Sequence, residues 1–200
     1  RSRFWRGHLP LVGVLVAWVV PLILQPDFGM VLVYGAAFAA MLVVAGTPLR
    51  HLAISLCAAL PPIAVAWWQI PYLRTRVLSF VHPERFAESA GWHILQFRRT
   101  LASGGPFGRT WGDCLWSRTH LPLGHTDSMF ATVGEAMGFV GTVPLLLLLA
   151  AWIVSVCQRS QNAESPFVAT AAVGLMAIIA GQALIHLSVN LGLMPVTGLT

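Results

Sequence analysis

The stretch LPLGHTDSMFATVGEAMGFVG, residues 121–141, joins a polar segment to an apolar run that continues without a charged side chain to Gln158. It carries His125, Asp127 and Glu135 shortly before or at the start of that run. About 20 consecutive apolar residues suffice to cross the hydrocarbon core of a bilayer, so the run predicts a transmembrane helix. Ionisable groups at membrane depth are costly, and a functional role is therefore their default interpretation.

The composition of the whole chain also indicates a membrane protein. Of the 200 residues 56% are hydrophobic and 10% are charged, whereas soluble domains carry about 25% charged residues. We predict an all-α, polytopic transmembrane helical bundle with about five spans and a long extracytoplasmic loop. The predicted spans cover about residues 9–25, 28–47, 52–71, 138–157 and 166–189, and the loop covers about 72–137.

The orientation follows from the arginines in short loops. The basic residues near the first span, between the second and third spans, and between the fourth and fifth spans fall on one side in an alternating topology. Because such residues prefer the cytoplasm, that side is predicted to be cytoplasmic and the long loop to face outward. Basic residues scattered between apolar spans do not make a nucleic-acid-binding face. The three cysteines show no disulfide framework or zinc spacing.

Asp127 lies where the loop re-enters the membrane, and two interpretations are open. Its carboxylate is either a helix N-cap that accepts from the N–H groups of Met129 or Phe130, or a functional group. Both can hold together. Glu135 lies about 12 Å further along a helix axis, which is too far for an acid and base pair of the glycosidase type. We expect Glu135 to pair with an arginine or to fix the local fold.

Other polar residues have equally plain structural interpretations. Asp27 follows Pro26 directly before an apolar run, a pattern typical of a helix N-cap. The SGG sequence at residues 103–105 could bring a backbone close to a phosphate, although a simple turn explains it as well. The outer arginines could bind phosphate through their planar guanidinium groups or contact lipid head groups. They are Arg74, Arg76, Arg98, Arg99, Arg109 and Arg118.

Five segments in this order resemble the SEDS (shape, elongation, division and sporulation) family, which includes RodA, FtsW and SpoVE. QPDFG at 25–29 is similar to the family's QPDLG, and YLRTRVLSFVHPE at 72–84 is similar to its Y-x-x-x-R-[IV] segment. ASGGPFGRTW at 102–111 resembles its glycine-rich stretch, and HTDSMFATVGEAMGFVG at 125–141 resembles HTDFIFAVIGEELGFVG. NLGLMPVTGLT at 190–200 resembles N-x-G-x-x-P-x-T-G-[IV]-P.

The chain departs from the family pattern at several positions. The aromatic residue after HTD is Ser128 here, and the second glutamate is Ala136. Thr110 ends the usual G-x-G, and the family's G-Y-Q has Trp92 followed by His93. These departures indicate a divergent member, of which this chain would be roughly the C-terminal half. The chain also lacks an initiator Met and ends in an apolar run, so we expect it to be part of a longer protein.

The resemblance implies a peptidoglycan glycosyltransferase that polymerises lipid II on the outer face of the bacterial cytoplasmic (inner) membrane. It further implies a class B penicillin-binding protein as partner, contact with membrane lipids and no nucleic acid. The family's presumed catalytic aspartate corresponds to Asp127. The substrate-binding residues that we predict with it are Arg74, Arg76, Gln96, Ser103, Gly104, Gly105, His125, Thr126 and Glu135.

One predicted carboxylate base among several arginines suits the displacement of a pyrophosphate by a sugar hydroxyl. A departing pyrophosphate needs cations and no acid, while the acceptor hydroxyl needs one base. A divalent cation such as Mg²⁺ could share the pyrophosphate charge, although the sequence shows no metal-ligand spacing. Two other functions remain open at this point: a lipid-linked precursor transporter (flippase), and a non-catalytic membrane scaffold for a penicillin-binding protein.

Overall fold

The computed structural model describes residues 13–14, 17, 20–22, 27–54, 57, 68–109, 113–119, 121 and 127–196. No strand occurs within these ranges, which confirms the predicted all-α class. The named elements are α2 (Phe28–Val44), α4 (Pro71–Val81), the 3-10 helix η1 (Pro83–Phe86), α5 (Ala90–Gly104), α6 (Leu115–Thr119), α7 (Met129–Gln161) and α8 (Pro166–Asn190).

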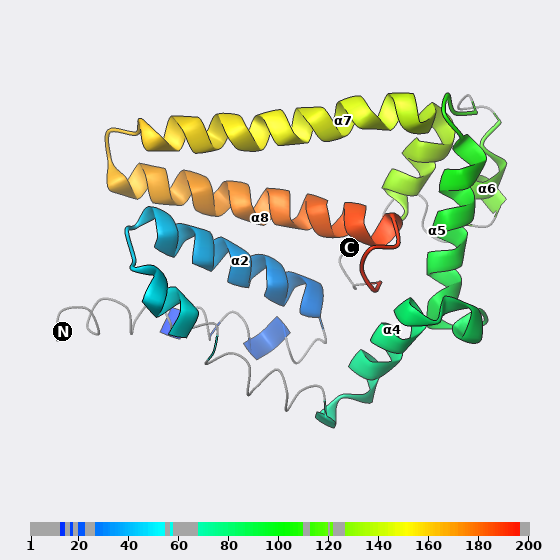
Figure 1. Cartoon of the computed structure of the whole chain (residues 1–200), viewed down its shortest axis with the longest axis horizontal. Coiled ribbons are helices and arrows are strands. Elements are labelled where there is room, and N and C mark those ends of the chain that lie inside the picture. The colour runs from blue at the N-terminus through cyan, green and yellow to red at the C-terminus, as the bar shows by residue number, and fades with distance from the viewer. Residues whose placement is uncertain are drawn as a thin grey trace.

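Three helices run side by side, with α8 between α2 and α7 (Figure 1). Within the described part of the chain, α7 with 33 residues and α8 with 25 residues are long and apolar enough to cross a membrane. The apolar α2 is shorter, with 17 residues. Large side chains on these helices, such as Leu148 and Leu175, are exposed and suit a hydrocarbon surrounding.

The predicted span at 9–25 and most of the one at 52–71 lie outside the described residues, so the number of spans stays a prediction. The three other predicted spans coincide with α2, α8 and the long part of α7. However, α7 begins at Met129, well before residue 138, because the chain is helical on both sides of a kink within it.

Helix starts follow from local sequence signals. Asp27 Oδ1 accepts from the backbone N–H of Met30 at 3.1 Å, which confirms the predicted N-cap of α2. Pro71 and Pro166 occupy the first positions of α4 and α8, where a missing N–H costs nothing.

The kink in α7 is centred on Gly138, which has φ 64° and ψ −169°. This conformation interrupts the helical bonds and leaves N–H groups without partners inside the helix. The N–H of Phe139 donates to the carbonyl oxygen of Gly105 at 3.1 Å, and that of Val140 donates to Pro106 at 3.0 Å. The backbone after α5 therefore replaces the helical bonds that the kink removes.

Glycines permit this close approach of two backbones. A Cβ built on Gly104 would lie 2.2 Å from the carbonyl oxygen of Gly134, and one on Gly138 would lie 2.2 Å from the nitrogen of Gly108. Neither contact leaves room for a methyl group. The crossing of α5 and α7 is therefore fixed by backbone contact, and it places the first turns of α7 beside α5 (Figure 1).

We expect Gly138→Ala to destabilise the protein by about 2 kcal/mol or more. A left-handed backbone costs an L-residue about 1 to 2 kcal/mol, and a forced contact in a packed region adds about 1 to 3 kcal/mol. The measurement is the thermal unfolding temperature in detergent. Gly35→Ala is the matched control, because an added Cβ meets nothing within 4 Å there. Equal unfolding temperatures for the two variants would contradict this account of the kink.

Candidate functional site

Asp127 lies directly before α7, and its carboxylate is not the cap of that helix. The N-cap residue is Ser128, without a side-chain cap bond. The Oδ1 atom of Asp127 is buried and accepts no hydrogen bond from any described residue. The N-cap interpretation of Asp127 is therefore wrong. In the first turn of the helix the N–H of Ala131 donates to Asn190 Oδ1 at 3.1 Å.

Arg76 on α4 is partly buried and joins three parts of the chain. Its Nη1 donates to the carbonyl oxygen of Val196 at 2.6 Å. Its Nη2 donates to the hydroxyl of Tyr72, whose ring centroid lies 4.3 Å from the guanidinium carbon. Burial lowers the pKa of Arg76 and the carboxylate of Asp27 opposes this shift, so α2 begins close to the same cation.

His93 on α5 is a site residue that the sequence reasoning did not single out. Burial lowers the pKa of His93 below its usual 6.5, the carboxylate of Asp127 opposes the shift, and the charge of Arg76 adds to it. His93 therefore lies within electrostatic reach of both predicted site residues. The sequence marked His93 only as a departure from the family pattern, which has Gln at this position.

A stripe of polar residues follows His93 along one face of α5. Gln96 and Thr100 lie three and seven positions further, which places them on the same side of the helix. Gln96 is 4% exposed and Thr100 is fully buried, and neither Gln96 Oε1 nor Thr100 Oγ1 has a partner among the described residues. Buried polar atoms without hydrogen-bond partners are rare in folded proteins.

The remaining predicted residues have other surroundings. Arg74 donates from Nη2 to the carbonyl oxygen of Trp68, and its guanidinium lies 5.2 Å from the centroid of that ring. Among the other outer arginines, Arg109 donates from Nε to the carbonyl oxygen of Ser103 at 2.9 Å. His125 and Thr126 lie outside the described residues.

Ser103, Gly104 and Gly105 lie where α5 crosses α7. Ser103 Oγ lies within hydrogen-bond distance of Glu135 Oε1, at 3.1 Å, and Gly105 has φ +57°. Gly104 provides the close approach to Gly134 described above. These residues join two helices, and a role for them in phosphate binding stays a prediction.

Glu135 is completely buried, and both carboxylate oxygens are occupied. Oε1 accepts from the backbone N–H of Trp116 at 3.0 Å, and Oε2 accepts from that of Ser117 at 2.8 Å, both in α6. Its own carbonyl oxygen accepts from the N–H of Arg109 at 2.8 Å. Of the two expectations for Glu135, the structure shows the one in which it fixes the local fold.

We expect Glu135→Gln to lower the thermal unfolding temperature. The amide replaces an acceptor oxygen by a donor, so one N–H of α6 stays unpaired, at a cost of about 1 to 3 kcal/mol. The matched control is Glu164→Gln, at an exposed position. An unfolding temperature of the Glu135 variant equal to that of the control would show that these hydrogen bonds add no stability.

The lowered pKa of His93 predicts a pH dependence of stability. Because the folded state favours the neutral ring, stability is fully present above the unfolded pKa, near 6.5, and is lost as the pH falls below it. Compared with His93→Gln, the wild-type protein should lose more unfolding temperature between pH 7 and pH 5. Parallel pH profiles of the two proteins would contradict burial of the ring beside a cation.

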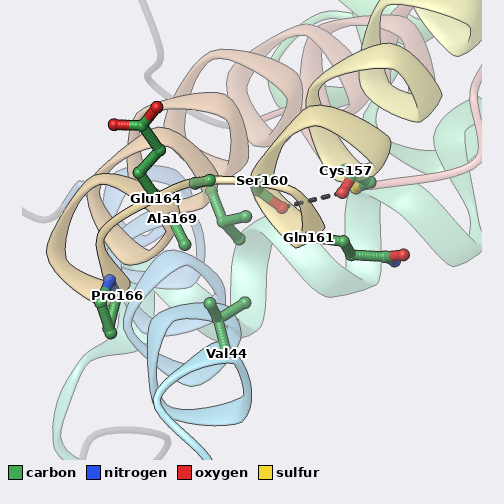
Figure 2. Close-up of a pocket in the computed structure, with 9 residues that line it drawn as sticks. Val44, Cys157, Ser160, Gln161, Glu164, Pro166 and Ala169 are labelled. Atoms are coloured by element: carbon green, nitrogen blue, oxygen red, sulfur yellow. Dashed lines mark hydrogen bonds between the residues drawn. The ribbon is translucent and has the colours of Figure 1, made fainter.

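A separate hollow lies at the other end of the long helices. This cavity of about 540 Å³ is formed at the turn between α7 and α8, with the end of α2 beside it (Figure 2). Ser160 Oγ donates to the carbonyl oxygen of Cys157 there at 2.8 Å. The cavity is remote from Asp127, which precedes the opposite end of α7, and it takes no part in the candidate site.

No group of three or more His, Cys, Asp or Glu side chains that could hold a metal ion occurs in the part of the chain that the structure describes. The polar site therefore consists of one partly buried carboxylate, one histidine, one arginine and buried neutral acceptors. They come from α4, α5 and the start of α7.

These features define an α-helical protein with helices of membrane-spanning length and a polar site beside the start of one of them. The model of the cell cycle protein family that comprises FtsW, RodA and SpoVE matches residues 1–200, and the chain belongs to this family. The family that the five sequence segments indicated is thereby confirmed.

The curated relatives of the chain include probable peptidoglycan glycosyltransferases. The chain is 35% identical over 182 residues to a probable peptidoglycan glycosyltransferase FtsW from Thiomicrospira cyclica, covering 90% of this chain and 47% of the relative. It is 34% identical to the protein of the same name from Saccharophagus degradans, covering 98% of this chain and 51% of the relative. The chain thus spans about half the length of these curated relatives.

A solved structure has the same fold. It was described as structural coordination of polymerization and crosslinking by a peptidoglycan synthase complex. The TM-score is 0.76 at 31% sequence identity, and the match covers 100% of this chain and 55% of the other chain.

Proposed function

We propose that the protein carrying this chain is a peptidoglycan glycosyltransferase that polymerises lipid II into glycan strands for cell wall synthesis. The names of the relatives support this activity, because several are probable peptidoglycan glycosyltransferases. The single observation that carries the proposal is the buried Oδ1 of Asp127, which has no hydrogen-bond partner among the described residues.

In this proposal Asp127 is the general base. Its carboxylate takes the proton of the acceptor sugar hydroxyl as that oxygen bonds to the anomeric carbon of the donor. The bond from that carbon to the pyrophosphate breaks, and the lipid pyrophosphate leaves as an anion. Since the leaving group needs no proton, one carboxylate suffices, and nearby cations stabilise the departing charge.

Arg76 is the cation that we assign to the pyrophosphate side of the site. It stays charged at any accessible pH, and its charge acts on His93 together with that of Asp127. Gln96 offers an acceptor to a substrate hydroxyl from the same face of α5 as His93. A divalent cation bound with the substrate would share the pyrophosphate charge.

The proposed setting is a multi-pass protein of the bacterial cytoplasmic membrane with about five spans in this chain. The loop at about 72–137 and the site then face outward, where lipid II presents its sugars. A class B penicillin-binding protein is the proposed partner. The similarity to a chain of a peptidoglycan synthase complex supports this pairing.

We expect Asp127→Asn to leave a folded protein that polymerises lipid II about 10²- to 10⁴-fold more slowly, the contribution of a positioned general base. The assay measures glycan strands made by the full-length protein together with its penicillin-binding protein. Asp113→Asn, an exposed change outside the proposed machinery, is the control.

Wild-type polymerisation by the Asp127 variant would exclude Asp127 as the base. Translocation of lipid II without strand growth by the unaltered protein would instead favour a transporter. Activation of the penicillin-binding protein by an inactive partner, unaffected by Asp127→Asn, would favour a scaffold.

A further inference from the structure

Asn190, the last residue of α8, is buried with 1% of its surface exposed, and its side chain bonds to the start of another helix. Its Nδ2 donates to the carbonyl oxygen of Asp127 at 3.0 Å and to that of His186 at 2.9 Å. Its Oδ1 accepts from the N–H of Ala131 at 3.1 Å. Both donor hydrogens and the acceptor oxygen of the carboxamide are therefore used.

The chemistry of these three bonds selects an amide. The side chain must donate twice to carbonyl oxygens and accept once from an N–H group, and a carboxamide does all three. A reversed amide would put its oxygen against the carbonyl oxygens of Asp127 and His186, so the orientation of Asn190 is determined. An aspartate offers no donor, and a serine has a single hydrogen to share.

The bonds of Asn190 lie on either side of Ser128 and fix the backbone that carries Asp127. The first turn of α7 has no cap from its own N-cap side chain, and Asn190 satisfies the N–H of Ala131 from a different helix. The carboxylate of Asp127 makes no capping bond to this turn, although it lies directly before the helix. Its Oδ1 stays without a partner among the described residues.

The surroundings of this contact are buried and apolar. Ala131 and Val189 belong to one buried apolar cluster in which α7, α8, α5 and α2 meet. The chain that follows Asn190 reaches Val196, whose carbonyl oxygen accepts from Arg76. A seven-residue segment therefore holds the backbone of the carboxylate at one end and the guanidinium at the other.

We propose that Asn190 is a positioning residue, which holds the backbone of Asp127 so that its carboxylate points at the acceptor hydroxyl. The inference rests on the proposed function, in which Asp127 is the base. Asn190 acts on the reaction through Asp127 and does not contact the substrate. Loss of its bonds should consequently lower kcat and leave KM nearly unchanged.

The test measures kcat and KM for lipid II polymerisation by the full-length protein with its penicillin-binding protein. For Asn190→Ala we expect kcat to fall about 10- to 100-fold, as for misplaced catalytic groups, with KM within about twofold of wild type. Rates are divided by the amount of folded protein, measured by size-exclusion chromatography and thermal unfolding. Asn190→Ser, which keeps a polar group in the same space, should lose less kcat and serves where the alanine variant does not fold.

Ser188→Ala is the matched control on the same helix, because the Ser188 hydroxyl donates to Leu184 of α8 itself. It should keep wild-type kcat and KM. Asp127→Asn is measured in parallel to separate the two hypotheses. If Asp127→Asn is inactive but folded Asn190→Ala and Asn190→Ser keep wild-type kcat, the positioning role is wrong and the proposed function stands. If Asp127→Asn is active, the proposed function itself is wrong.

A rise in KM at unchanged kcat would overturn the inference as well, because it would indicate substrate binding. A loss of activity that only follows the loss of folded protein would reduce Asn190 to a stabilising residue. In either case the result differs from the kcat effect that a displaced base produces.

Discussion

The structure depends on the exchange of backbone hydrogen bonds at the break in α7. Gly138 interrupts the helix, and the carbonyl oxygens of Gly105 and Pro106 accept from the N–H groups that the break leaves over. In an apolar surrounding an unpaired backbone group costs several kcal/mol, so the break exists only together with the loop that fills it. This exchange turns the first turns of α7 toward α5 and so determines where Asp127 lies.

The two carboxyl groups near the start of α7, Glu135 and Asp127, differ in burial and in hydrogen bonding, and this difference separates a structural role from a chemical one. Glu135 is completely buried and accepts from the backbone N–H groups of Trp116 and Ser117, so it is held in place on both oxygens. Asp127 is only partly buried, and its Oδ1 has no partner among the described residues. A fully bonded carboxylate organises its neighbours and gains nothing from a proton, whereas an unengaged oxygen is suited to accept one.

The sequence predicted the features that depend on local chemistry. Asp27 before an apolar run gave the correct beginning of α2, because a cap depends on the few residues around it. The family was identified from short segments whose order was preserved. The break at Gly138 could not be predicted, since its partners Gly105 and Pro106 directly follow α5, more than 30 residues earlier, and become neighbours only after folding. For the same reason the sequence left a capping role for Asp127 open beside a functional one, and His93 was noted only as a departure.

The seven-residue segment from the end of α8, Asn190–Val196, explains why these distant residues form one site. Asn190 holds the backbone of Asp127, and the carbonyl oxygen of Val196 accepts from Arg76. The residue with the carboxylate and the residue with the cation are therefore both bonded to the same short segment. His93 lies within reach of both charges from α5. In the proposed reaction one oxygen loses a proton while another leaves as an anion, and a short segment that bonds to the backbone of the base and to the cation suits that requirement. The site is thus assembled by backbone anchoring, which leaves the carboxylate of Asp127 with an acceptor oxygen that the described part of the chain does not use for itself.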